Sequence, residues 1–241
     1  MAKIHKGHNH LKEKARTNLL LSILFILPSV MYFYAFIVHR FHFEGFYHLL
    51  GIVPAMIGFS FFRKYSSLKS GIEGESAATN ALSSLPSSYE VFSTVQIPTK
   101  NKLAEIDNIV VGENGIFVIE VKNHNGTIVG SEEDRSWTQH KVGQKGGEYS
   151  SKMNNPVKQV RWQVHQLAEY LRKNGVNLWI EGAVYFSNPR VSVRVSTNRT
   201  PVFTSSQALN RYIMNQIPNR KMNRSDIERA IQLILSRLNT R

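Results

Sequence analysis

The feature that most constrains this chain is a run of 20 residues without a charged side chain, from Leu19 to Val38. A helix rises about 1.5 Å per residue, so a helical run of this length matches the roughly 30 Å hydrocarbon core of a bilayer. A second run, Phe46 to Phe62, is 17 residues long and contains glycine and proline, so by itself it is a marginal span. We predict two transmembrane helices, at about 19–38 and 46–62, that form a hairpin over residues 19–65.

Lysine and arginine flank the two runs unevenly. Five lie before the first run, Arg40 lies between the runs, and three follow the second. Because cytoplasmic segments carry the excess of positive charge, we expect a multi-pass protein of the cell (plasma) membrane with both termini in the cytoplasm. The alternatives are a cleaved signal peptide and a single signal anchor that exports the rest of the chain. A long apolar core without a small-residue cleavage pattern argues against cleavage.

The remainder of the chain is polar and basic. We expect residues 1–18 to form a basic cytoplasmic tail, 66–71 a linker, 72–190 a soluble domain, and 191–241 a basic extension with an amphipathic helix. From Arg190 onward there are ten Lys or Arg residues against two acidic ones, within a formal net charge of +13. Such an excess suits a nucleic-acid backbone or an anionic membrane surface. No motif that reads a nucleic-acid sequence is present, so sequence-specific binding is not expected.

Hydrophobic periodicity in the soluble part predicts an α/β or α+β domain. The expected helices cover residues 74–85, 155–173, 205–216 and a last segment from Ser225, and the expected strands cover residues 89–97, 105–111, 116–122, 179–186 and 202–204. The chain contains no cysteine, which excludes disulfide scaffolds, cysteine-ligated metal sites and thiol catalysis.

The four-residue loop Gly112 to Gly115 sets the register of a predicted hairpin, and in that register Asp107 lies directly opposite Glu120. Like charges in that position are destabilising, and Glu120 also interrupts an apolar run where an unpaired carboxylate is costly. A divalent cation between the two side chains would resolve both costs. Lys122 is two residues beyond Glu120 and therefore points to the same face of the sheet.

These residues form an Asp…Glu-x-Lys constellation that resembles the PD-(D/E)xK phosphodiesterase superfamily. With Glu75 in the opening helix, the segments EIDNIVV and FVIEVKN, the segment of Gly126 and Trp137, and NPVKQVRWQVHQL, residues 72 to 187 resemble the nuclease-related (NERD) domain of bacteria and archaea. The resemblance implies a restriction-endonuclease-like fold, with a central mixed sheet flanked by helices, here preceded by two transmembrane helices.

The resemblance also implies a metal site. Asp107 and Glu120, with the carbonyl of Val121, would hold Mg²⁺ or Mn²⁺ through oxygen ligands, and the ion would lower the pKa of an attacking water. The implied reaction is hydrolysis of a phosphodiester in DNA or RNA.

Three further residues have implied roles in that reaction. Lys122 would orient the water or offset developing charge on the phosphate. Glu75 would complete or orient the metal shell, and Gln159 would reach the same end of the sheet from the long helix. Each also has a structural alternative. Lys122 faces Glu105 in the same register, Glu75 suits the start of a helix, and Gln159 is one of several glutamines on its helix.

Two other functions remain open. The first is a catalytically inactive module that holds nucleic acid or protein at the cytoplasmic membrane face, and the second is a protein-binding role in envelope maintenance. The combination of Asp107, Glu120 and Lys122 favours the enzyme, because a module that only binds does not need two facing carboxylates.

Overall fold

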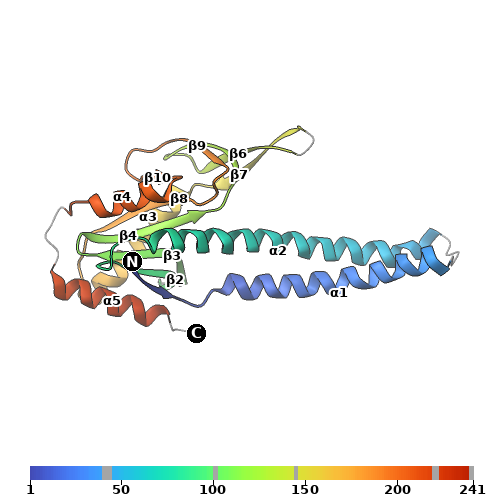
Figure 1. Cartoon of the computed structure of the whole chain (residues 1–241), viewed down its shortest axis with the longest axis horizontal. Coiled ribbons are helices and arrows are strands. Elements are labelled where there is room, and N and C mark those ends of the chain that lie inside the picture. The colour runs from blue at the N-terminus through green and yellow to red at the C-terminus, as the bar shows by residue number, and fades with distance from the viewer. Residues whose placement is uncertain (40–44, 100–102, 144–145, 219–222, 239–241) are drawn as a thin grey trace. The chain divides into compact units, whose positions relative to one another are not determined.

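A computed structural model of the chain describes residues 1–39, 45–99, 103–143, 146–218 and 223–238 (Figure 1). Arg40, which lies between the two apolar runs, is outside the described residues. The chain folds as two compact units. We call Asn9–Ile72 the helical unit, and Met1–His8 together with Glu73–Arg241 the sheet unit.

The helical unit contains α1 (His10–His39), the short 3₁₀ helix η1 (Gly45–His48) and most of α2 (Leu49–Leu82). Glycines allow the two long helices to approach each other. A Cβ atom at Gly51 would lie 2.5 Å from a ring carbon of Tyr32, and one at Gly58 would lie 2.6 Å from Cγ1 of Ile26. Small residues at such contacts are common between helices in membranes.

Both predicted apolar helices are present, and both are long and apolar enough to cross a membrane. In the most apolar window of each helix only 11% is buried, unlike the core helix of a soluble protein. Large apolar side chains are therefore exposed along both helices, such as Leu24 at 62% and Met56 at 68%. Apolar surface of this extent requires a partner or a lipid environment.

Helix α2 continues through residues 66–71, where a linker was expected, and includes most of the helix expected over residues 74–85. The polar composition of residues 66–71 does not interrupt a helix, because the segment contains no proline and its one glycine, Gly71, costs only about 1 kcal/mol. The end of the helix is fixed by packing, since Ala78 and Leu82 are fully buried in the sheet unit. The expected linker is thus a continuous helix.

The main sheet of the sheet unit has six strands in the order β1-β2-β3-β4-β8-β10. Strands β2, β3 and β4 are antiparallel neighbours, whereas the pairs β1–β2, β4–β8 and β8–β10 are parallel. The strands are β1 (Lys3–Lys6), β2 (Glu90–Pro98), β3 (Leu103–Gly112), β4 (Gly115–Lys122), β8 (Ile180–Phe186) and β10 (Val202–Phe203). The predicted mixed sheet in an α/β fold is confirmed.

A second mixed sheet has four strands in the order β7-β6-β5-β9, and none of them was among the expected strands. They are β5 (Gly126–Ser131), β6 (Ser136–Val142), β7 (Glu148–Asn154) and β9 (Val191–Ser196). Because β9 pairs with β5, the boundary expected at residue 190 divides a sheet. The residues after it, which were expected to form a separate extension, belong to the same unit.

Helices cover both faces of the six-stranded sheet. Helices α3 (Pro156–Lys173) and α5 (Arg224–Leu238) pack on one face, in a core that also includes Trp137 of the second sheet. The end of α2 and helix α4 (Ser206–Asn215) pack on the other face. Strand side chains alternate between the two cores, so Val118 belongs to the α3 face and Ile119 to the α2 face.

Strand β1 lies where a basic tail was expected. It is parallel to β2, and its His5 stacks on Phe92 with ring centroids 4.8 Å apart. Nε2 of His5 is 2.7 Å from a carboxylate oxygen of Glu90. These contacts order a segment whose four residues include two lysines and which carries no apolar alternation of its own.

Candidate active site

The predicted register of β3 and β4 holds from the turn to the pair Asn108–Ile119. Asp107 and Glu120 come next, and at this point the regular pairing ends. Instead, Oδ2 of Asp107 accepts a hydrogen bond of 2.8 Å from the backbone N–H of Val121. Asp107 therefore replaces a backbone carbonyl as the partner of β4.

The pairing of β3 with β2 is interrupted at the same position. Thr94 would face Asp107, but its φ angle is 57°, in the left-handed region. A β-branched residue rarely adopts this conformation, which costs roughly 1–3 kcal/mol and occurs most often at functional sites. Asp107 is thus released from regular strand pairing on both sides.

Glu120 is 1% exposed and is held by two donors on the α3 face of the sheet. Nζ of Lys122 lies 2.6 Å from one carboxylate oxygen, and Nε2 of Gln163 donates to the other at 2.8 Å. Lys122 also donates to Oε1 of Gln159 at 3.0 Å. Because Gln159 and Gln163 are one turn apart, α3 presents both amides to the end of β4.

The alternative pairing of Lys122 with Glu105 is not what the structure shows. Regular pairing of β3 with β4 ends before these two residues, and the Lys122 ammonium binds Glu120 instead. Glu105 is exposed, and its backbone carbonyl accepts a hydrogen bond of 3.2 Å from Gln163.

The position of α3 is fixed at its first residues. Oδ1 of Asn155 caps the helix by accepting from the N–H groups of Val157 and Lys158. Nδ2 of the same side chain donates to three carbonyls of the turn at residues 131–134. The Asn-Pro start of the helix therefore anchors α3 to the second sheet, and this anchor sets where Gln159 and Gln163 lie.

Helix α2 brings Glu75 to the same end of the sheet. The preceding residue, Gly74, lies against the segment after β4, since a Cβ atom there would stand 2.6 Å from Cβ of Asn123. Glu75 is half-buried and close enough to Asp107 for its charge to raise the pKa of that carboxyl.

One turn further along α2, Thr79 joins a buried polar network beside Asp107. Oγ1 of Thr79 lies 2.9 Å from Oγ of Ser93 and donates to Oδ1 of Asn108 at 3.1 Å. Ser93 and Asn108 are the paired residues next to the Asp107 irregularity. The network therefore ties α2 to both strands at the point where their pairing is broken.

The pKa of the Asp107 carboxyl lies well above its ordinary value. Burial is the largest cause, and the negative charge of Glu120 is the next. The hydrogen bond from Val121 and the positive charge of Lys122 oppose the shift, while Glu75 adds to it. The site therefore has more negative charge than its own lysine neutralises.

The donor atoms at this site fit Mg²⁺ or Mn²⁺. The carboxylates of Asp107 and Glu120 supply hard oxygen ligands. Oε1 of Gln163 is buried without a hydrogen-bond partner among the described residues, and it belongs to the amide that holds Glu120. The carboxylate oxygens of Asp107, Glu120 and Glu75 are not all within 4.8 Å of one another in the described structure. The three carboxylates therefore do not form one coordination shell in the described structure.

His124, which lies just beyond Lys122, was not among the site residues predicted from the sequence. Its Nδ1 is 3.3 Å from Oε1 of Gln139 in β6. Burial lowers the pKa of His124, and the positive charges of Lys122 and Lys141 add to this effect against the Gln139 hydrogen bond. Its position within FVIEVKNHNG was visible in the sequence, but its neighbours belong to the sheet that was not predicted.

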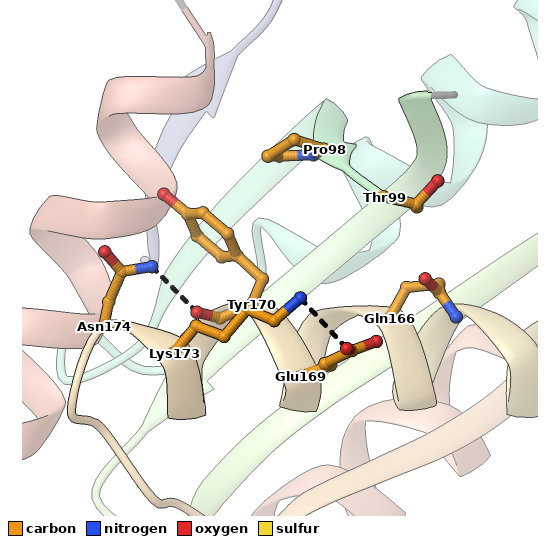
Figure 2. Close-up of a pocket in the computed structure, with 7 residues that line it drawn as sticks. All are labelled: Pro98, Thr99, Gln166, Glu169, Tyr170, Lys173 and Asn174. Carbon is orange, nitrogen blue, oxygen red and sulfur yellow. Dashed lines mark hydrogen bonds and ion pairs between the residues drawn. The ribbon is translucent and has the colours of Figure 1, made fainter. Parts of the chain in front are cut away.

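A cavity of about 320 Å³ lies at the other end of α3, and none of the candidate residues lines it (Figure 2). Its polar groups bind one another: Nζ of Lys173 is 3.0 Å from Glu169, and Asn174 donates to the carbonyl of Tyr170 at 2.8 Å. The lining residues are Pro98, Thr99, Gln166, Glu169, Tyr170, Lys173 and Asn174. The cavity is separate from the carboxylate site.

Comparison with known proteins gives a family match and a relative. The family model described as nuclease-related domain (NERD) matches residues 70–187. An uncharacterised protein of Bacillus anthracis is 36% identical over 105 residues, which are 40% of this chain and 47% of that protein. The chain therefore matches about half the length of this relative. No solved structure matches the chain.

Proposed function

Residues 70–187 are a nuclease-related domain, and from this premise we propose that the chain hydrolyses phosphodiester bonds of DNA or RNA with Mg²⁺ or Mn²⁺. One observation supports this above all. Asp107 and Glu120 come together beside Lys122, at a point where both flanking strand pairings are interrupted. A domain that only bound nucleic acid would gain nothing from two acidic groups that repel the phosphate backbone.

In this proposal Asp107, Glu120 and the carbonyl of Val121 hold the metal. A bound Mg²⁺ would supply a Lewis acid for the phosphate and a water of lowered pKa. Lys122, whose ammonium lies 2.6 Å from Glu120, would offset charge that develops on the phosphate. Gln159 is a positioning residue, because its amide oxygen binds that ammonium.

Two other residues act through the metal ligands. Gln163 fixes the orientation of Glu120 through its 2.8 Å hydrogen bond. Glu75, on α2, adds negative charge to the site and orients the metal shell. It does not share one coordination shell with both Asp107 and Glu120. Fixed outer partners of this kind commonly change metal affinity or activity by about 10–100-fold when removed.

We also propose that the two apolar helices span the cell membrane as a hairpin, with both termini in the cytoplasm. Strand β1 supports the hairpin, because it precedes α1 and yet pairs with β2, which follows α2. The N–H of Gly7 extends this pairing by donating to the carbonyl of Ser93 at 2.8 Å. Segments of one sheet lie on one side of a membrane, so the chain between them crosses an even number of times.

The absence of cysteine from the chain permits a direct topology test. Single cysteines introduced at Lys3 and at Glu133, both in the sheet unit, are expected to react with a membrane-impermeant maleimide only after cells are opened. Labelling of either cysteine in intact cells would contradict a cytoplasmic sheet unit.

A non-catalytic tether at the membrane is a second candidate, and one specific observation favours it. Lys122 already forms a 2.6 Å ion pair with Glu120, so part of the acidic charge is neutralised within the chain. In that case the basic residues from Arg190 onward would bind a polyanion, and the carboxylates would serve structure alone.

One experiment separates the two candidates. The full chain in detergent is incubated with plasmid and with RNA in Mg²⁺ or Mn²⁺, beside an Asp107→Ala, Glu120→Ala variant. The full chain is needed because β1 is a strand of the sheet. Degradation by the wild type alone is expected. Equal degradation by both chains would contradict the proposed active site. Salt-sensitive binding by both chains without degradation would support the non-catalytic tether.

A further inference from the structure

Strands β6 and β7 continue as a two-stranded arm beyond the body of the second sheet (Figure 1). Strand β5 pairs with β6 only at residues 138–140, whereas β7 pairs with β6 along residues 136–142. On the outer part of the arm Tyr149 is 54% exposed, and Val142, which pairs with Glu148 on the opposite face, is 70% exposed. The exposed aromatic ring of Tyr149 on a narrow ribbon favours an interaction surface on its face.

One face of the arm connects to the candidate active site through Gln139 and His124. Gln139 is 3% exposed, donates to the carbonyl of Asn125 at 2.7 Å and contacts His124. Side chains alternate along a strand, so Lys141 lies on the same face as Gln139, and Tyr149 is its directly opposed partner. This face therefore leads outward from His124, which itself follows Lys122 of the candidate active site.

Lys141 is available to bind an anion. Its charge reaches His124 and its side chain lies over Gly126, where a Cβ atom would be 3.3 Å from Cγ of Lys141. Among the described residues, no carboxylate lies within 4.0 Å of its ammonium. Beside it, the exposed ring of Tyr149 offers an aromatic surface with the size and chemistry of a base-stacking platform.

We propose that this face of the arm binds a single strand of nucleic acid continuing from the active site, with Lys141 on a phosphate and Tyr149 stacked on a base. The inference rests on the proposed function for its ligand class. A single strand is the occupant because its bases are free to stack on an aromatic side chain, whereas those of a duplex are covered by their neighbours.

The arm contains its own matched control. Lys152 lies on the same strand as Tyr149, is exposed, and pairs with Thr138 on the opposite face. Lys152→Ala and Lys141→Ala each remove one positive charge from the arm. A non-specific attraction of nucleic acid to positive charge would therefore respond equally to both variants.

Binding is measured by fluorescence anisotropy with the full chain in detergent and EDTA, which prevents hydrolysis, and the probes are a labelled oligothymidylate and a duplex of the same length. Tyr149→Ala is expected to weaken single-strand binding about tenfold, and Tyr149→Phe to preserve it. Lys141→Ala should weaken binding more than Lys152→Ala and lower the salt dependence by about one phosphate contact.

Equal effects of Lys141→Ala and Lys152→Ala, or unchanged binding by Tyr149→Ala, would overturn the proposal. Thermal unfolding of every variant checks the fold, and Tyr149→Thr repeats the test with a strand-favouring residue. Hydrolysis is assayed separately with Mg²⁺. Binding that depends on the Lys141 face without hydrolysis would support the proposed role of the arm and contradict the catalytic proposal. Hydrolysis together with equal effects of the two lysine variants would contradict only the proposed role of the arm.

Discussion

Two acidic sites contact α3, one through Glu132 and the other through Glu120, and the pKa values of their carboxyl groups shift in opposite directions. Glu132, in the turn after β5, accepts hydrogen bonds from the backbone N–H groups of Asn198 and Arg199 and forms an ion pair with Arg161. These hydrogen bonds, with the charge of Arg161, lower the pKa of Glu132. At the other site burial and the charge of Glu120 raise the pKa of Asp107.

The difference favours a structural role for Glu132, and it fits the catalytic role proposed for the Asp107 site. Glu132 has partners for its charge, and those partners join the turn after β5, α3 and the loop after β9. Asp107 receives one backbone hydrogen bond and lies beside a second carboxylate, next to a strained residue, Thr94. A chain that tolerates such a cost at one position commonly does so for function.

The largest expected effect follows from removing Lys122, the cation paired with Glu120. Lys122→Met leaves Glu120 buried without its cation, which is expected to cost about 3–5 kcal/mol in the free energy of unfolding at neutral pH. Glu120→Gln in the same chain should recover most of that loss. Urea unfolding of the two single variants and the double variant, followed by tryptophan fluorescence, measures the coupling. Additive effects would show that the pair does not interact.

The rate of catalysis should also distinguish Lys122, the cation beside Glu120, from Arg161, the cation beside Glu132. Lys122→Ala is expected to lower kcat by about 10²–10³-fold, because it removes a charge that stabilises the transition state. Arg161→Ala should lower stability and leave kcat of the folded fraction nearly unchanged. Single-turnover cleavage with active-protein normalisation makes the comparison. A similar loss of kcat in both variants would mean that Lys122 is a structural residue.

Metal binding should stabilise the protein through the Asp107 site alone. Mn²⁺ at 100 times its dissociation constant is expected to add about 2.7 kcal/mol to the wild type and to Glu132→Gln. Asp107→Asn should lose this stabilisation. Thermal unfolding across a Mn²⁺ titration gives the result without an activity assay, and equal stabilisation of all three chains would locate the metal elsewhere.

The smallest effect is a pH dependence of opposite sign at the two sites. A raised pKa means that ionised Asp107 opposes folding, so Asp107→Asn should stabilise the chain at pH 7. That gain should vanish as the pH falls through the raised pKa. The Asn side chain still accepts from Val121.

For Glu132 the lowered pKa means that its stabilisation is complete above the ordinary value of 4.5 and is lost as the pH falls through the lowered value. Glu132→Gln should therefore be less stable than the wild type at pH 7, with the gap closing in acid. Thermal unfolding from pH 3 to pH 8 compares the variants. A change of stability with the same sign in both variants at pH 7 would contradict pKa shifts of opposite direction at the two sites.

Sequence reasoning predicted the part of the site that local chemistry determines. The turn at Gly112 to Gly115 fixes the register of β3 and β4, and the predicted register holds to the pair Asn108–Ile119. The predicted pair of Asp107 with Glu120 would come next, and there the regular pairing ends. The periodicity of α3 and its Asn-Pro start located Gln159. The loss of regular pairing at Asp107 was not predictable, because it depends on the conformation of Thr94 in another strand.

The second sheet and β1 could not be predicted for a related reason. Strand β7 (EYSSKMN) is almost entirely exposed, so no apolar alternation indicates a strand. Strand β1 depends on a partner more than 80 residues away, across both apolar helices. Such elements are ordered by long-range pairing rather than by local pattern.

Cleavage of labelled nucleic acid by three versions of the chain decides whether the carboxylate pair is catalytic. Wild type, Glu120→Gln and Glu132→Gln are compared at neutral pH with Mg²⁺, and cleavage is normalised to folded protein. Both substitutions remove one buried acidic charge beside α3. Cleavage by wild type and Glu132→Gln with none by Glu120→Gln is predicted, and cleavage by Glu120→Gln at the wild-type rate would contradict a catalytic carboxylate pair.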